Sequence, residues 1–252
     1  MKRKLLAVSL VFLSGVAGAF AAQVDGDFHD PFAADSAEGK PTIKVSDPLE
    51  KLNRATYKFN DKFYEWLLKP AAKGYRFVVP TPVRESLDRC FSNIKYPVRL
   101  VNNLLQGKVT GAAIESGRFI CNSTIGLGGF FDPAACKFKL KAQPADFDQT
   151  LGFYGIPAGF YLTLPLLGPS SARGAFGFAG DGALNPTLYL NIAVVQYVQY
   201  GVSGGEVLNK TSLRLEEYDT LKNGTFDPYI AMRSAYFEHR VEMVKAAHDV
   251  VK

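Results

Sequence analysis

Residues 47–67 read Asp47-Pro-Leu-Glu-Lys-Leu-Asn-Arg-Ala-Thr-Tyr-Lys-Phe-Asn-Asp-Lys-Phe-Tyr-Glu-Trp-Leu67, and this stretch decides the fold class. Its large apolar side chains recur every third or fourth residue, which is the spacing of one face of an α-helix. Asp47 is suited to accept the free N–H groups at a helix start, and Pro48 fits the first turn because it has no N–H to leave unpaired. The pattern predicts a core helix that ends at Pro70.

Further helices are predicted on both sides of two irregular segments. The segments 125–135 and 151–168 are apolar but rich in glycine, proline and aromatic residues, and neither keeps a steady helix or strand period. Residues 137–148 read as a polar loop. The sequence therefore predicts an all-α fold with irregular apolar connections. The other helices are expected from Thr81-Pro82, over 97–105 and 109–123 with Gly107 as a stop between them, over 184–202, and from Asp227-Pro228 to the end.

The first 22 residues read as a signal peptide. A basic start at Met1-Lys-Arg-Lys4 precedes an apolar run over 5–20, and Ala19-Phe20-Ala21 resembles a cleavage site. The run is shorter than the ~20 residues that a spanning helix needs, so cleavage is favoured over an uncleaved anchor. Residues 23–45 are polar and read as a linker, which leaves 46–252 as one domain.

Composition disfavours several classes of function. The net charge of +5 would fall to +2 if cleavage removed the three leader cations, so it gives little support for a nucleic-acid partner. The three cysteines form no C-x-x-C pair and the chain has three histidines, so no metal site and no cofactor are expected. Buried unpaired cysteines are favoured, although one disulfide is possible. The cysteines are Cys90, Cys121 and Cys136.

One enzyme motif matches by letters alone. Gly201-Val-Ser203-Gly-Gly205 fits G-x-S-x-G, and Asp219 or Asp227 followed by His239 or His248 would complete the order of a hydrolase triad. The nucleophile elbow needs a strand before the serine and an alternating α/β sheet around it, which the chain lacks. The protein is therefore predicted not to be an enzyme. A periplasmic lipid hydrolase that uses Ser203 remains the alternative.

The irregular segments need a protected setting. Lipid offers no hydrogen bonds to an irregular backbone, so such segments are buried in protein or line a cavity. With 13% aromatic residues, the chain also suits a membrane interface, where one end of an aromatic ring is apolar and the other wet. An ordinary core with long loops remains an alternative at this point.

An ordered series of segments resembles the MlaA/VacJ family of outer-membrane lipid-asymmetry proteins. The series spans about 46 to 244 and no single piece of it is decisive. Its main members are Asp47 to Asn60, Val79-Pro-Thr-Pro-Val-Arg84, Val101-Asn-Asn-Leu-Leu-Gln-Gly107, Arg118-Phe119, Asn122 to Asp132, Asp146-Phe-Asp-Gln-Thr-Leu-Gly152, Leu167-Gly-Pro-Ser170 and Asp227-Pro-Tyr229.

The resemblance implies an irregular ring of helices set in the inner leaflet of the outer membrane, with an amphipathic channel for phospholipid. It also implies passage of the lipid to a periplasmic carrier and association with a trimeric porin. The gating helix of the family matches Asn53, Phe59 and Asn60, and a flexible hairpin beside the pore matches Gly126, Leu127, Gly128, Gly129, Phe130 and Phe131. Arg84, Arg118 and Arg173 are candidates to contact phosphate, with surface or salt-bridge roles as the alternative.

The chain departs from the family pattern at several positions. No cysteine follows the leader, since the first is Cys90, so the protein is predicted not to be a lipoprotein and to lie on the periplasmic side of the outer membrane. Asp148 and Phe160 stand where the family usually has Gly and Pro. Gly174 stands where an Asp commonly follows the arginine. A purely structural envelope protein is the third interpretation.

Overall fold

The computed structural model describes residues 45–184 and 193–251. The predicted signal peptide, and the predicted linker up to residue 44, lie outside these residues, as does the first part of the helix expected from residue 184. In the described part the chain is helical apart from one short hairpin, so the predicted all-α class is confirmed.

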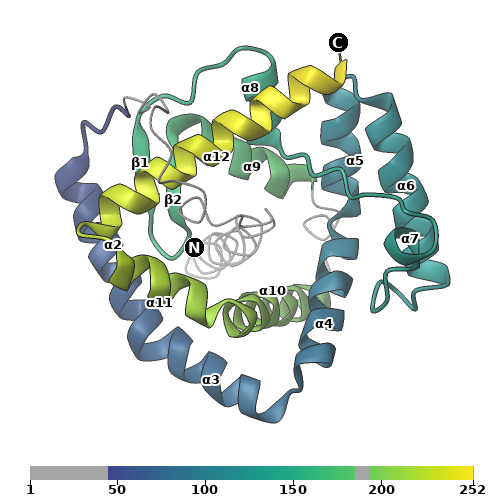
Figure 1. Ribbon diagram of the computed structural model, residues 1–252, viewed down its shortest axis with the longest axis horizontal. Coiled ribbons are helices and arrows are strands. Elements are labelled where there is room, and N and C mark those ends of the chain that lie inside the picture. Colours follow the sequence, from purple (N-terminus) through teal and green to yellow (C-terminus); the bar gives the residue numbers. More distant parts are fainter. Residues whose placement is uncertain (1–44, 185–192, 252) are drawn as a thin grey trace.

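The helices follow one another around a ring (Figure 1). The first helices occupy one side of the ring, α4 and α5 the other, and α12 crosses between them at the top of the view. Contacts of α10 with α3 and α4, and of α12 with α8 and α11, close the ring. In chain order the elements are α2 (Glu50–Phe63), η1 (Tyr64–Leu68), α3 (Lys69–Val78), α4 (Thr81–Ile94), α5 (Tyr96–Leu105), α6 (Val109–Thr124), α7 (Pro133–Cys136), α8 (Phe147–Phe153), β1 (Tyr161–Leu164), β2 (Gly168–Ser171), α9 (Ala172–Leu184), α10 (Ala193–Leu213), α11 (Leu215–Gly224) and α12 (Pro228–Val251).

The first helix does not end at Pro70, as the sequence predicted. The five residues of η1 form a π-helix, and α3 then continues to Val78 with Pro70 in its first turn. A proline in the first turn of a helix needs no hydrogen bond from its own nitrogen. Because the π-helix changes the hydrogen-bond spacing just before the proline, the chain passes it without a break.

The helix starts predicted at Thr81-Pro82 and Asp227-Pro228 are confirmed, whereas the start expected at residue 184 is not, because Leu184 is the last residue of α9. Helices α4 and α12 begin at Thr81 and Pro228, and Gly107 has a φ of 71°, which suits a glycine that ends α5 and turns the chain into α6. The short helix α11 and helix α9 were not predicted. All three cysteines are free, and Cys136 is exposed, so the expectation of burial is wrong for that residue.

The segment 151–168 contains an antiparallel hairpin that the sequence analysis missed. Strand β1 pairs with β2 so that Tyr161 lies opposite Ser171 and Leu164 opposite Gly168. The hairpin packs against α2, α9 and α12. Strand β1 is four residues long and has Pro169 opposite it, so apolar and polar residues do not alternate over enough positions to be recognised. The hydrophobic period of the sequence therefore could not reveal the hairpin.

The distribution of polar and apolar side chains is inverted relative to a water-soluble protein. Trp66 and Phe77 are 81% and 92% exposed, whereas Asn102 and Glu115 are fully buried. The apolar stripe of α2 also points outward, so the prediction of a core helix is right about the helix and wrong about its direction. Large exposed apolar surfaces mark contacts with a membrane or a protein partner. In the described part of the chain, no helix is long and apolar enough to cross a bilayer.

Many of the buried polar side chains are paired with one another or with the backbone. Glu115 accepts a hydrogen bond from Nε of Arg99 at 2.7 Å, and Asn209 donates to the backbone oxygen of Arg84 at 2.8 Å. Such pairing offsets the cost of removing polar groups from water. A small aromatic core accompanies this network between β1 and α12. It consists of Tyr161, Tyr229, Tyr236 and Phe237.

Candidate functional site

Two asparagines of α2 hold strand β1 in place. Asn53 donates to the backbone oxygen of Tyr161 at 3.0 Å and accepts from the N–H of Thr163 at 2.8 Å. Asn60, two helical turns later, makes the same pair of bonds with Leu164 and Leu166, at 2.9 and 2.8 Å. Each side-chain amide therefore offers β1 one donor and one acceptor, as a neighbouring strand would.

These two asparagines lie together on the inner face of α2, whereas Phe59 does not join them. Asn53 is 1% exposed and Phe59 is 53% exposed. The candidate gating residues therefore divide into two that position the hairpin and one that faces outward.

The predicted hairpin beside the pore is an irregular turn that follows α6. Leu127, Gly128 and Gly129 have consecutive positive φ values of 51°, 76° and 100°. This run explains why no regular element forms here, since only glycine adopts such angles without strain. Large apolar side chains of the turn are exposed, including Ile125, Leu127 and Phe131.

The same turn is attached to its neighbours by asparagine side chains. Asn93 of α4 donates to the hydroxyl of Ser123 at 3.0 Å and to the backbone oxygen of Gly128 at 3.3 Å. A Cβ added at Gly129 would lie 2.6 Å from Cβ of Asn93, so a side chain cannot enter without a shift. At the other end of the turn, Asn122 donates to Oδ1 of Asp132 at 3.0 Å. The apolar tip is therefore presented on a polar, well-connected base.

The three candidate phosphate-binding arginines all bond within the protein. Arg84 is 3% exposed and donates to the backbone oxygens of Val79 and Ser212. Arg118 pairs with Asp132 at 2.8 Å. Arg173 pairs with Asp148 at 2.6 Å and also donates to the backbone oxygen of Ile156. Their donors tie segments of this chain together, and contact with phosphate stays a prediction.

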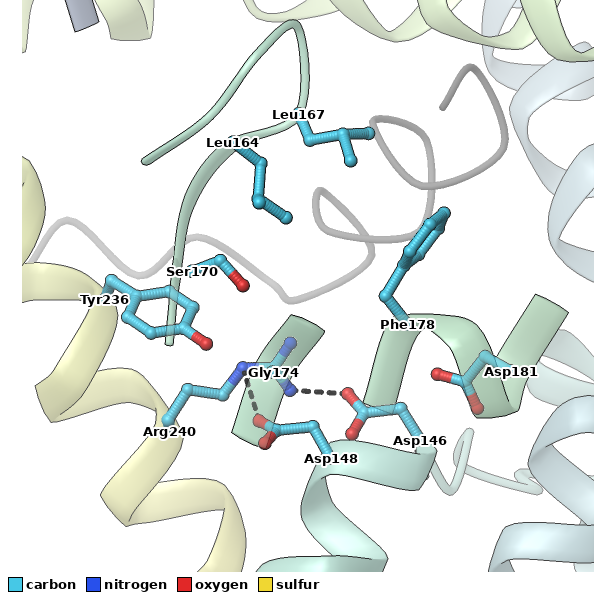
Figure 2. A pocket seen from close by; sticks show the side chains of 10 residues that line it. All are labelled: Asp146, Asp148, Leu164, Leu167, Ser170, Gly174, Phe178, Asp181, Tyr236 and Arg240. Carbon is cyan, nitrogen blue, oxygen red and sulfur yellow. Dashed lines mark hydrogen bonds and ion pairs between the residues drawn. The ribbon is translucent and has the colours of Figure 1, made fainter. Parts of the chain in front are cut away.

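A cavity of about 50 Å³ lies between α8, α9, α12 and the hairpin (Figure 2). Figure 2 shows Leu164, Leu167 and Phe178 on one side and the charged residues gathered on the other. Arg240 bonds to Asp146 and lies 3.3 Å from Oδ2 of Asp148. The cavity is therefore amphipathic, with an apolar wall facing an ion-pair cluster. Its other lining residues are Ser170, Gly174, Asp181 and Tyr236.

The carboxyl groups of this cavity differ in their ease of ionisation. Burial opposes ionisation of Asp146, but the charge of Arg240, the hydrogen bonds from Gln149 and Arg240 and the charge of Arg173 together outweigh it and lower the pKa of Asp146. Burial, and then the charge of Asp146, raise the pKa of Asp181 to about 7. Asp181 accepts hydrogen bonds from Asn102 at 3.0 Å and from the N–H of Phe147 at 2.9 Å, and no ion pair of its own holds it charged among the described residues. Asp181 is therefore the group of this cluster that titrates near neutral pH.

Two departures from the family pattern fall in this one cavity. Asp148 and Gly174 both line it. A Cβ at Gly174 would lie 2.5 Å from the hydroxyl of Tyr236, so this position has no room for a carboxylate in the present arrangement. Asp148 of α8 supplies the carboxylate that pairs with Arg173 and Arg240 instead. Sequence reasoning singled out positions 148 and 174 but missed Asp181 and Arg240, because nothing in their local sequence signals that the fold brings them together.

The hydrolase motif does not form a nucleophile elbow. Ser203 lies within helix α10, with neither a strand before it nor a sharp turn at it. His239 and His248 are exposed on α12, and His248 stacks on the ring of Phe153 at 4.7 Å. Asp219 forms an ion pair with Lys69. In the described part of the chain, no group of three or more His, Cys, Asp or Glu side chains is placed to hold a metal ion.

Comparisons with known proteins agree with the sequence resemblance. The sequence profile described as MlaA lipoprotein matches residues 45–243. The chain is 32% identical over 209 residues to the "Intermembrane phospholipid transport system lipoprotein MlaA" of Haemophilus influenzae, covering 82% of each protein. It is 34% identical over 198 residues to the protein of the same name from Escherichia coli, covering 77% of this chain and 76% of that one. A solved structure from "Structural basis for maintenance of bacterial outer membrane lipid asymmetry" superposes with a TM-score of 0.66 at 32% identity, covering 79% of this chain and 99% of that one.

The names of these relatives overturn one expectation. The profile and both relatives are named lipoproteins, so the prediction that the present protein is not a lipoprotein is wrong. That prediction depended on a single feature, the missing cysteine after the leader, and the leader lies outside the described residues. One local feature of a targeting segment is weaker evidence than similarity along most of the domain.

Proposed function

The chain belongs to the MlaA family, and from this premise we propose that it maintains the lipid asymmetry of the outer membrane by removing phospholipid from the outer leaflet. It acts in intermembrane phospholipid transport, as its relatives are named to do. The chemistry is a change of location, with no bond made or broken.

The observation that carries this proposal is the inverted distribution of side chains. Apolar residues such as Trp66 and Phe77 face outward from the ring, and polar residues such as Asn102, Glu115 and Asn209 are buried in it. An apolar exterior is stable against acyl chains, and polar side chains that bond to one another in the interior are held away from them. The ring of helices in Figure 1 thus suits a protein whose outer face lies against lipid tails.

The cavity beside α8 and α9 also combines apolar and charged surfaces. Its apolar wall and its charged wall meet near Ser170 and Tyr236, so the cavity presents both kinds of surface that a phospholipid carries. We infer that the hairpin positioned by Asn53 and Asn60, and the turn at Gly126–Phe131, border the lipid path and control its opening.

The direction of transport needs a partner. A pore alone equilibrates phospholipid between its two sides, so net removal requires an acceptor that keeps the free concentration low on the periplasmic side. We propose that a periplasmic lipid carrier is that acceptor. A trimeric porin would hold the ring at the correct depth in the outer membrane, consistent with the exposed apolar belt of α2 and α3.

The test is the amount of phospholipid in the outer leaflet of a strain that lacks the gene. Wild-type protein and Ser203→Ala should both restore the low level, because Ser203 lies inside α10 and forms no elbow. Gly129→Ala should fail, because its Cβ would meet Asn93 at 2.6 Å and distort the turn. If deletion leaves the outer leaflet unchanged, the transport function is refuted. If Ser203→Ala alone fails, a hydrolase replaces it.

A further inference from the structure

A buried lysine without a counter-charge lies at the junction of α5 and α6. Lys108 is 8% exposed, and among the described residues its ammonium group has no hydrogen bond or ion pair. Burial lowers the pKa of Lys108, and no neighbouring carboxylate offsets this effect. A largely buried cation with no partner in the chain is stabilised by an anion from outside it.

Lys108 also lies at the N-terminal end of α6, which is the positive end of the helix dipole. Lys108 is the N-cap residue of α6, which is 16 residues long, and no side chain caps it. The first N–H groups of a helix have no acceptor within it, and the helix dipole adds partial positive charge there. A Cβ added at Gly111 would lie 3.5 Å from Cβ of Lys108, so the lysine side chain begins beside this first turn. Two positive features therefore coincide, and each favours an anion.

The surroundings are apolar and exposed. Leu104, Leu105 and Val109 are 52%, 41% and 70% exposed on both sides of the lysine. The hydroxyl of Tyr154 donates to the backbone oxygen of Leu105 at 2.6 Å, while the tyrosine itself is 66% exposed. Exposed leucines beside a tyrosine and a lysine are typical of the boundary between acyl chains and headgroups, where lysine reaches toward phosphate.

We propose that the α5–α6 turn is a binding site for the phosphate group of a phospholipid, with Lys108 and the start of α6 as the anion site and the leucines as the surface for its acyl chains. This assignment rests on the proposed function in lipid transport, and it adds a headgroup site on the ring. The ligand class is a phosphodiester with two acyl chains. Free phosphate shares the charged part of that chemistry and lacks the apolar part.

The experiment uses the full chain in a maltoside detergent, which contains no phosphate. Dihexanoyl-phosphatidylglycerol and inorganic phosphate are titrated separately, and binding is followed by ³¹P line broadening and by the ¹³Cε resonance of Lys108. The lipid should bind saturably and raise the pKa of Lys108, because a bound anion favours the charged ammonium. Lys108→Met should weaken lipid binding about tenfold or more, the effect of one lost charge-assisted hydrogen bond.

Lys73→Met is the matched control. Lys73 is an exposed lysine on α3, so this variant has the same change of charge at a place without the burial or the helix start. Lys108→Met should also unfold at the same or a higher temperature than wild type without lipid, since it removes an uncompensated buried cation. A purely structural role of the lysine would instead lower the unfolding temperature.

Three outcomes would overturn the assignment. Unchanged lipid binding in Lys108→Met excludes the lysine as a ligand. Equal losses in Lys108→Met and Lys73→Met indicate general charge attraction. Saturable binding of inorganic phosphate with no gain from the acyl chains indicates a free-phosphate site. The outer-leaflet assay separates these failures from a failure of the transport function, because it asks only whether the wild-type protein clears phospholipid.

Discussion

The contact between α2 and the β hairpin leads to a quantitative prediction. Asn53→Ala would leave the backbone oxygen of Tyr161 and the N–H of Thr163 without partners at a site where these residues are 1% and 7% exposed. An unsatisfied buried group costs about 1–3 kcal/mol, so the loss of partners for these two groups should destabilise this contact by about 2–6 kcal/mol. Asp47 also loses the hydrogen bond that Asn53 donates to it at 2.8 Å.

Asn60→Ala should have a smaller effect at the other end of the strand. Its partners Leu164 and Leu166 are only half-buried, so water replaces part of the lost bonding. We expect a loss of about 1–2 kcal/mol there, near the net value of one or two ordinary hydrogen bonds.

Amide hydrogen exchange of the full chain in detergent measures both effects locally. A free-energy loss of 1.4 kcal/mol corresponds to a factor of about ten. The amide of Thr163 should therefore exchange about 30-fold faster or more in Asn53→Ala, and the amide of Leu166 about tenfold faster in Asn60→Ala. Thr56→Ala is the control, because its hydroxyl bonds only to Leu52 in the same helix.

The reasoning is refuted if the two amides keep their wild-type protection in the corresponding variants. It is also refuted if Thr56→Ala exposes them equally, because the effect would then come from a general weakening of α2. A specific loss at Thr163 in one variant and at Leu166 in the other would establish that the asparagines act as a substitute neighbouring strand for β1.

Three further predictions concern the turn, the cavity and the apolar belt. Gly129→Ala should lower the unfolding temperature more than Gly128→Ala, because both have positive φ but only the first meets a neighbouring side chain at 2.6 Å. Asp181→Asn should raise the unfolding temperature at pH 8 and change it little at pH 4. The folded pKa of Asp181, about 7, exceeds its unfolded value, so its contribution favours folding at low pH and is lost as the pH rises toward 7. Asp249→Asn makes the same change at an exposed carboxyl and is the control. Trp66→Gln should weaken partition into phospholipid vesicles about tenfold or more without lowering the unfolding temperature, since Trp66 is 81% exposed.

Helix starts were readable from the sequence because they depend on local chemistry. Thr81-Pro82 and Asp227-Pro228 each place a polar residue and a proline where a helix begins, and helices α4 and α12 start there. The same local reasoning failed at Pro70, because the π-helix before it is a local change of hydrogen-bond spacing that no residue type specifies.

Contacts between distant segments could not be read in the same way. The hairpin 161–171 depends on Asn53 and Asn60, which lie about a hundred positions earlier in the chain, and its own four-residue strands carry no clear period. The cavity likewise combines Asp146, Asp181 and Arg240 from three helices. Each of these residues alone is an ordinary charged group, and only the fold makes them a cluster.

The helical period of α2 identified one apolar face but could not say which way it points. Leu52, Phe59 and Trp66 are 60%, 53% and 81% exposed, whereas Asn53 is 1% exposed. In water an apolar stripe packs inward, which is why the sequence favoured a core helix. In a ring that lies in lipid the same stripe faces the acyl chains, and the polar residues on the opposite face form the interior. The sequence of α2 alone does not distinguish the two settings, because a helix in water also carries polar residues opposite its apolar stripe, where they meet solvent.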